Sequence, residues 1–241
     1  MRILPVSDLH LEWHMDRGQS FLASLDPTGV DVLVIAGDLV EAREAKGVLE
    51  GLASRFAQVV FVNGNHELYG LSPVQAHGFL NRAKAPNLHW LNQSTVTIEG
   101  VRFVGATLWF PKPPPGVPIW SYNDFNEIQG FVPWAYDEHR AALDFLRAEL
   151  RPEDVLVTHF FPLRESIHPN YRGHPLNCFF WSGEEADRVV RERGPRLAIC
   201  GHTHDSLRYK VGHTEVVCNP LGYVGSDLNP KFDERLIVEV P

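Results

Sequence analysis

The sequence predicts an α/β fold in which two mixed β-sheets pack face to face, with helices on their outer sides. Short apolar runs rich in Val and Ile alternate with helical patterns, as in parallel strands joined by crossover helices. Later regions instead indicate antiparallel strands. The chain has 241 residues, of which 44% are hydrophobic and 22% charged. This length and composition suit one large globular domain, so we expect a single domain over residues 1–241.

The predicted elements follow in chain order. Buried strands are expected at residues 3–6, 32–36, 59–62, 101–105, 155–157 and 197–200. Helices are expected at residues 42–56, 73–85, 136–150 and 184–193. Residues 87–91, 95–98 and 101–104 predict an antiparallel patch, with Glu99 and Gly100 in a tight hairpin turn. Residues 206–211, 215–218 and 236–240 show the same pattern.

One segment interrupts this alternation. Residues 111–134 contain six prolines and several aromatic residues, and they form a longer connection than compact domains usually have. We therefore expect a lid-like insertion at about residues 111–134, which belongs to the functional site rather than serving as a simple connector.

Charge and cysteine content narrow the class of protein. The net charge is -8, and an acidic surface repels the phosphates of an extended nucleic acid. The three cysteines form no CxxC pair, which favours a reducing compartment over a disulfide framework. The apolar run at the N-terminus is short for a signal peptide, and no apolar run suits a membrane span. We expect a cytoplasmic protein without a membrane partner.

The most informative feature is the set of polar residues at the ends of the apolar runs. Five of the predicted strands end in side chains that can bind metals, namely Asp8 and His10, Asp38, Asn65, His159, and His202 and His204. Residues i and i+2 of an extended segment point to the same side, so two of these sites can each direct two ligands to one place. The carboxyl ends of strands form the usual ligand crevice of an open α/β sheet.

The number and type of these donors indicate two cations. Seven donors are too many for one tetrahedral ion, and they suit two ions that share a carboxylate and a water-derived bridge. Mixed imidazole and carboxylate ligands favour Mn, Fe, Co or Zn. Two divalent cations bring four positive charges, and Asp8, Asp38 and a bridging hydroxide each remove one. The site keeps about one positive charge, which would attract a phosphate. Each motif alone is weak, since Gly-Asp is a common turn; their joint occurrence carries the prediction.

The motifs resemble those of the calcineurin-like metallophosphoesterase superfamily. The resemblance rests on Asp8-x-His10, Gly37-Asp38, Gly64-Asn65-His66-Glu67, Thr158-His159 and Gly201-His202-Thr203-His204, in this order along the chain. The turn that begins at Asn219 resembles that of a bacterial subset with poorly defined substrates.

This resemblance implies a four-layer α/β/β/α sandwich and assigns the ligands. One metal would be held by Asp8, His10, Asp38 and His204, and the other by Asp38, Asn65, His159 and His202. Asp38 would bridge the two, and His66 would lie near the leaving-group oxygen.

The expected activity is hydrolysis of a small phosphomonoester or phosphodiester. A hydroxide between two cations would attack phosphorus, and His66 would protonate the leaving group. Glu67 either orients His66 or caps a turn. The alternatives are a binding or scaffold module that has lost catalysis, which the full set of donors disfavours, and a nuclease, which the negative charge disfavours.

Two stretches could contact the substrate. One follows His159 and supplies Arg164, His168, Tyr171 and Asn177; the other is the proline-rich segment, with Tyr122 and Asn123. Arg164 could bind a phosphate oxygen or lie on the surface. The aromatic residues could stack on a base or pack within their loops.

Overall fold

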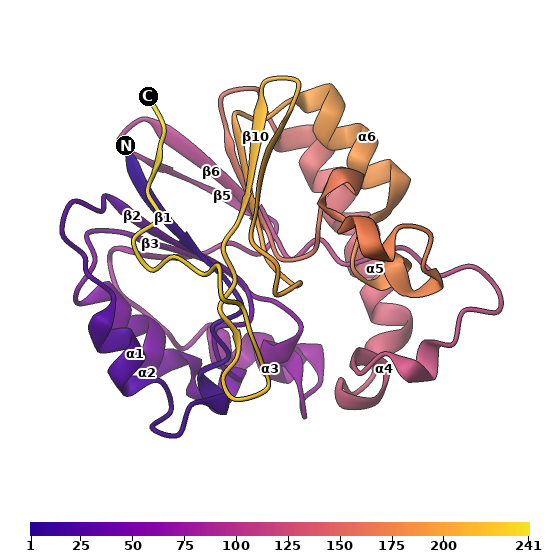
Figure 1. The fold of residues 1–241 in the computed structure, drawn as a ribbon, viewed down its shortest axis with the longest axis horizontal. Helices are drawn as coiled ribbons and strands as arrows, with labels where there is room; N and C mark the ends of the chain where they lie inside the picture. The colour runs from indigo at the N-terminus through magenta and orange to yellow at the C-terminus, as the bar shows by residue number, and fades with distance from the viewer.

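Two β-sheets form the centre of the structure, a computed structural model that describes residues 1–241 (Figure 1). The first sheet has the order β13-β1-β2-β3-β4, with bounds Val238–Glu239, Arg2–Val6, Val32–Ala36, Val59–Val62 and Leu88–Trp90. The second has the order β5-β6-β7-β8-β10-β9, with bounds Ser94–Ile98, Val101–Ala106, Val155–Thr158, Leu197–Cys200, Thr214–Cys218 and Leu207–Val211. A small hairpin joins β11 (Gly222–Tyr223) to β12 (Asp227–Leu228).

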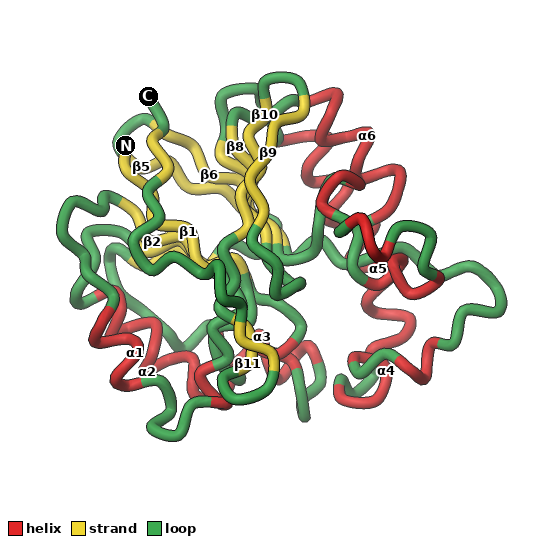
Figure 2. The backbone as a smooth tube through the Cα atoms, in the orientation of Figure 1, coloured by secondary structure: helices red, strands yellow, loops and turns green.

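Helices cover the outer face of each sheet (Figures 1 and 2). The first sheet carries α1 (Gln19–Ser24), α2 (Ala42–Ala53) and α3 (Pro73–Leu80), and the second carries α5 (Phe131–Glu149) and α6 (Gly183–Arg193). A short α4 (Asp124–Glu127) precedes α5. Short 3-10 turns lie at η1 (Leu11–Trp13), η2 (His66–Leu68), η3 (Ile119–Ser121), η4 (Arg164–Ser166), η5 (Pro169–Tyr171) and η6 (Pro175–Phe179).

Three apolar clusters hold these layers together. Val34 and Val60 of the first sheet pack with Val157 and Ile199 of the second, so the inner faces of the two sheets bury one another. The other two clusters lie between each sheet and its own helices. Strand side chains alternate between faces, which is why one all-apolar strand can supply two clusters. The predicted α/β/β/α sandwich is confirmed.

The pairing of the outer strands differs from the prediction in one place. The sequence pattern places β4 in an antiparallel patch with β5 and β6, but the strand lies in the first sheet, parallel to β3, with Trp90 opposite Phe61. A short apolar strand does not specify its partner, and here the chain crosses between sheets immediately after it. The predicted hairpin between β5 and β6 is confirmed, with positive φ at Glu99 (48°) and Gly100 (87°) as a tight turn requires.

The proline-rich segment is anchored by its aromatic side chains. Tyr122 stacks on Phe179 with ring centroids 4.8 Å apart, and Phe125 meets Phe131 edge-on at 5.1 Å. Trp120, which precedes these anchors, stays exposed. The segment therefore packs against the body of the protein near the carboxyl ends of the strands; that it moves as a lid stays a prediction. None of the helices combines the length and apolar character that crossing a bilayer requires.

Candidate active site

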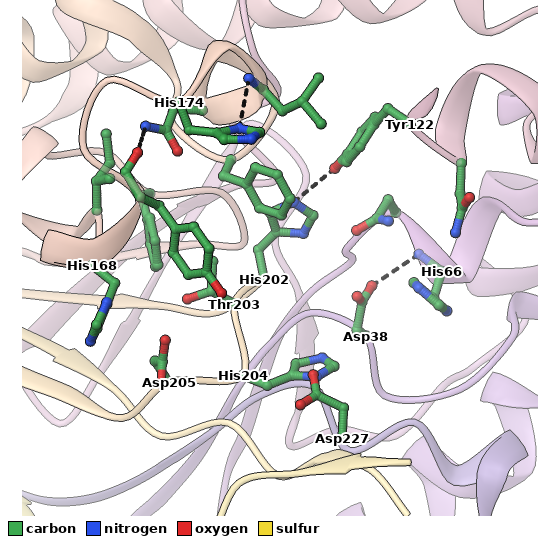
Figure 3. Close-up of a pocket in the computed structure, with 18 of the residues that line it drawn as sticks. Asp38, His66, Tyr122, His168, His174, His202, Thr203, His204, Asp205 and Asp227 are labelled. Atoms are coloured by element: carbon green, nitrogen blue, oxygen red, sulfur yellow. Dashed lines mark hydrogen bonds and ion pairs between the residues drawn. The ribbon is translucent and has the colours of Figure 1, made fainter. Parts of the chain in front are cut away.

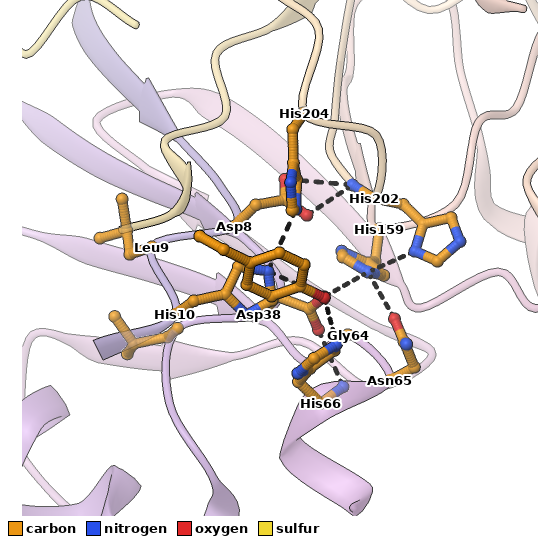
Figure 4. Close-up of polar contacts among 12 residues, drawn as sticks. Asp8, Leu9, His10, Asp38, Gly64, Asn65, His66, His159, His202 and His204 are labelled. Carbon is orange, nitrogen blue, oxygen red and sulfur yellow. Dashed lines mark hydrogen bonds and ion pairs between the residues drawn. The ribbon is translucent and has the colours of Figure 1, made fainter. Parts of the chain in front are cut away.

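All seven predicted metal donors meet where the carboxyl ends of the two sheets come together (Figure 4). Asp8 and His10 follow β1, Asp38 follows β2 and Asn65 follows β3, so the first sheet supplies four donors. His159 follows β7, and His202 and His204 follow β8 in the second sheet.

The backbone around these donors takes up conformations that are rare for residues with a side chain. Asp8, His10, Asp38 and His202 have φ values of 51°, 43°, 54° and 72°. Such left-handed residues cost free energy and concentrate at functional sites, where the surroundings hold them in place. Gly64 shows how crowded the site is, because a Cβ there would lie 2.1 Å from Asp38 Oδ1.

Asp8, His10 and His204 form the first group of donors. The Nε2 atoms of His10 and His204 face each other at 3.3 Å. Their Nδ1 atoms lie next to carboxylates: His10 Nδ1 is 3.2 Å from Glu12 Oε1, and His204 Nδ1 is 2.9 Å from Asp227 Oδ2. With Nδ1 donating to these carboxylates, both Nε2 atoms present lone pairs to one point, which is the arrangement of histidines that hold a metal.

The second group consists of Asp38, Asn65, His159 and His202. His159 Nε2 lies 3.3 Å from Asp38 Oδ2, 2.9 Å from Asn65 Oδ1 and 3.1 Å from His202 Nδ1. His159 Nδ1 donates to the Ala36 carbonyl at 2.8 Å, which turns Nε2 toward the other donors.

A cluster of acceptors such as this second group needs a positive charge. Burial lowers the pKa of His159, but the Asp38 carboxylate beside it outweighs this and raises that pKa to about 10. A divalent cation would supply the positive charge that these acceptors need.

Asp38 faces both groups. Its Oδ2 lies 3.8 Å from His10 Nε2 and 3.3 Å from His159 Nε2, while its Oδ1 accepts the His66 backbone N–H at 2.9 Å. Burial raises the pKa of Asp38, but His159 and His66 together hold it well below the ordinary value. The side chain is therefore an ionised carboxylate between two sets of ring nitrogens.

His66 lies beside these groups, with both ring nitrogens engaged. Its Nδ1 is 3.5 Å from Glu12 Oε1, and its Nε2 is 2.9 Å from the Tyr223 hydroxyl. Burial lowers the pKa of His66, but Asp38 and Glu12 raise it to about 9. Sequence reasoning missed Glu12, whose only signal was its spacing two residues after His10. The turn that begins at Asn219 and includes Tyr223 was expected near the site, but no pattern indicated the contact of Tyr223 with His66.

Glu67 does not orient His66. Its buried carboxylate accepts backbone N–H groups from Asp38 at 3.1 Å, Leu39 at 2.7 Å and Gly64 at 2.7 Å. It therefore caps the turns after β2 and β3 and ties them together, as the second of the two predicted roles requires. Glu12 makes the contact to His66 that the first role gave to Glu67.

A further acidic residue, from the proline-rich segment, holds Asn65. Asp124 of α4 is fully buried, and its Oδ1 accepts from Asn65 Nδ2 at 2.9 Å and from the Tyr69 hydroxyl at 2.8 Å. Because the amide nitrogen of Asn65 is held by Asp124, its oxygen points to His159. The proline-rich segment thus reaches the metal-binding side chains.

A pocket of about 620 Å³ opens over these groups (Figure 3). Of the predicted substrate contacts, those that line it are Tyr122, Asn123, His168, Tyr171 and Asn177. The Tyr122 hydroxyl also lies 2.8 Å from His202 Nε2. Arg164 does not line the pocket: it pairs with Glu184 at 3.4 Å and lies over the Trp181 ring. Of the two roles that the sequence left open for Arg164, its position favours the surface one, because the acidic start of α6 holds the guanidinium there.

Comparisons with known proteins agree with this fold. The uncharacterized protein L509 of Acanthamoeba polyphaga mimivirus is 25% identical over 260 residues, which cover 92% of each chain. The structure of the phosphopantetheinyl hydrolase PptH from Mycobacterium tuberculosis has a TM-score of 0.74 at 21% identity, covering 92% of this chain and 89% of that one.

The structure of TT1561 from Thermus thermophilus follows at a TM-score of 0.58 and 13% identity, covering 91% of this chain and 88% of that one. At these identities the two structures show the fold alone. The model of the calcineurin-like phosphoesterase family matches residues 1–206, which carry all the motifs described above. The chain belongs to the calcineurin-like phosphoesterase family.

Proposed function

We propose that this protein hydrolyses a small phosphate ester with the help of two divalent cations. One observation carries the proposal: seven donors from both sheets form two groups, and the Asp38 carboxylate faces both. Asp8, His10 and His204 would hold one cation, Asn65, His159 and His202 the other, and Asp38 would bridge them.

The donor set fits Mn, Fe or Zn. It combines four imidazoles, two carboxylates and one amide oxygen, and it contains no thiolate. When bound, such cations supply an activated water and neutralise charge on the phosphate. The residues around them fix the geometry, because each histidine discussed above has its other nitrogen held by a carboxylate, a carbonyl or a hydroxyl.

His66 is suited to protonate the leaving group. Its Nε2 points toward the pocket and carries the Tyr223 hydroxyl as partner, while Glu12 stabilises the protonated ring from the Nδ1 side. In the balanced reaction, water adds its oxygen to phosphorus and loses one proton to solvent, the bond from phosphorus to the ester oxygen breaks, and the departing oxygen takes the proton from His66 Nε2. A proton from solvent then restores the protonated His66, whose Nε2 keeps the Tyr223 hydroxyl as its partner.

The pocket accepts a small phosphorylated molecule rather than a polymer. Its volume of about 620 Å³ is that of a small-ligand site, and the net charge of -8 opposes an extended nucleic acid. A cytoplasmic location stays a prediction.

A binding or scaffold module is the other candidate, and one assay separates the two. The purified chain, loaded with Mn²⁺, is given p-nitrophenyl phosphate and bis(p-nitrophenyl) phosphate, and release of nitrophenol is followed. We expect turnover of one or both esters and its loss on chelation. No turnover of either ester at full metal occupancy would refute hydrolysis and support the binding module.

A further inference from the structure

The walls of the pocket differ on its two sides. His66 and Tyr122 lie on one side (Figure 3). The side away from His66 is made by residues that follow β7 and β8, with His168 and Asp205 among them. Neither of these two residues is a metal donor, so this side is available to a part of the substrate other than the phosphate.

Apart from His66 and the metal groups, the charged side chains that line the pocket are carboxylates. Asp205 and Asp227 line it, and no lysine or arginine does. Asp227 pairs with His204, whereas Asp205 has an exposed carboxylate. Of the two arginines between β7 and α6, Arg164 pairs with Glu184, and Arg172 is exposed and does not line the pocket. A phosphomonoester carries up to two negative charges at neutral pH, and these carboxylates disfavour the second charge.

The same side offers surface to an uncharged organic group. Ile167, Tyr171 and Leu176 supply apolar and aromatic surface, and Asn177 and His174 add polar groups. Tyr171 is 58% exposed, so its ring is free to pack on a ligand. A phosphomonoester has no group to place here, because its phosphate bears one organic arm and that arm leaves beside His66.

We infer that the substrate is a phosphodiester, with one arm leaving beside His66 and a second, uncharged and partly apolar arm on the Ile167–Tyr171 side. This inference rests on the proposed hydrolase function and adds the substrate class. Water replaces the leaving arm, so the products are an alcohol and a phosphomonoester that keeps the second arm. The second negative charge that appears on this product is disfavoured by Asp205 and Asp227, which helps the product to leave.

The first test compares a monoester, which can carry two negative charges, with a diester, which carries one. The Mn²⁺-loaded protein is assayed with p-nitrophenyl phosphate and with phenyl p-nitrophenyl phosphate, and we expect kcat/KM to be at least tenfold higher for the diester. Asp205→Lys should narrow this ratio about fivefold by favouring the monoester. Asp137→Lys makes the same change of charge at an exposed carboxylate on α5, and as the matched control it should leave the ratio unchanged. An equal or higher kcat/KM for the monoester would overturn the inference while leaving hydrolysis intact; cleavage of neither ester would refute hydrolysis itself.

The second test measures binding without turnover. Diphenylphosphinate carries one charge, two arms and no ester bond, whereas phenylphosphonate carries up to two charges and one arm. We expect calorimetry to show at least tenfold tighter binding of diphenylphosphinate. Tyr171→Ala should weaken the binding of diphenylphosphinate about fivefold and the binding of phenylphosphonate less than twofold. The control Trp120→Ala removes an exposed ring outside this pocket and should change neither. Equal weakening of both ligands by Tyr171→Ala would contradict an arm site there.

Discussion

Replacing Asp124 by Ala tests whether the proline-rich segment helps to build the second metal position. Asp124 Oδ1 is the acceptor that fixes the Asn65 amide, at 2.9 Å, and it also accepts from Tyr69 at 2.8 Å. Without it, the amide of Asn65 can rotate and present nitrogen instead of oxygen to the cation. The group of Asp8, His10 and His204 does not touch Asp124, so only one of the two cations should be affected.

The size of the effect follows from the hydrogen bonds that are lost. Asp124 is fully buried, so its removal leaves the Tyr69 hydroxyl without its acceptor, at about 1–3 kcal/mol for a buried donor, and leaves the Asn65 amide with only the Tyr69 hydroxyl oxygen, 3.1 Å from Nδ2. Loss of a residue that orients a metal ligand lowers affinity about tenfold to 100-fold. Both estimates are consistent with a loss of about 2 kcal/mol in the binding free energy of one cation, which raises the dissociation constant of that cation about thirtyfold.

Calorimetric titration of the metal-free protein with Mn²⁺ measures this directly. We expect the wild type to bind two ions and Asp124→Ala to bind one of them about thirtyfold more weakly. Asp124→Asn keeps an acceptor oxygen, and we expect the dissociation constants of both ions to stay within about threefold of the wild-type values. This variant also separates the effect on metal binding from misfolding. If both ions bind Asp124→Ala within twofold of wild type, Asp124 does not position Asn65.

Four further substitutions test other parts of the site. His66→Gln should keep both metals but lose most turnover of esters with poor leaving groups; an equal loss on activated esters would contradict proton donation. Asp38→Asn should sharply lower the metal content of the purified protein, and unchanged metal analysis would rule out a bridging role. Glu67→Ala leaves buried backbone N–H groups without an acceptor and should cost about 3 kcal/mol, seen as a fall in Tm of about 6–12 °C, whereas Glu67→Gln should lose less. In the metal-free protein Glu12 raises the pKa of His66, so Glu12→Gln should lower that pKa from about 9, and NMR titration of the imidazole would show no shift if the contact is absent.

The strands and the metal donors could be predicted because they depend on local pattern. The bounds of β2, β3 and β8 agree with the predicted ranges, since each is an apolar run that ends in glycine or a polar residue. The donors follow those ends directly, and parallel strands bring their carboxyl ends to one edge. The pattern of residue types along the sequence is therefore enough to predict these strands and the positions of the donors.

The residues that support the donors could not be predicted, because tertiary contacts alone select them. Asp124 and Tyr223 come from a proline-rich connection and a C-terminal turn, and no local pattern indicates their contacts with Asn65 and His66. The sequence left two roles open for Arg164 for a similar reason: whether an arginine faces a pocket depends on which carboxylate lies nearby, and Glu184 comes from a helix further along the chain. Strand β4 shows the same limit, since its partner is chosen by the whole sheet.

Each donor group takes side chains from both sheets, and this has a mechanical consequence. Asp8 and His10 come from one sheet and His204 from the other, just as Asp38 comes from one and His159 and His202 from the other. A cation in either group would therefore link the two sheets where their carboxyl ends meet, in addition to its role in the chemistry. At a free concentration about 100 times its dissociation constant, one such ion adds about 2.7 kcal/mol to the stability of the folded chain. Removal of the cations by chelation should thus weaken the contact between the two sheets first at the catalytic edge, while the apolar contacts at the opposite edge still hold the sheets together.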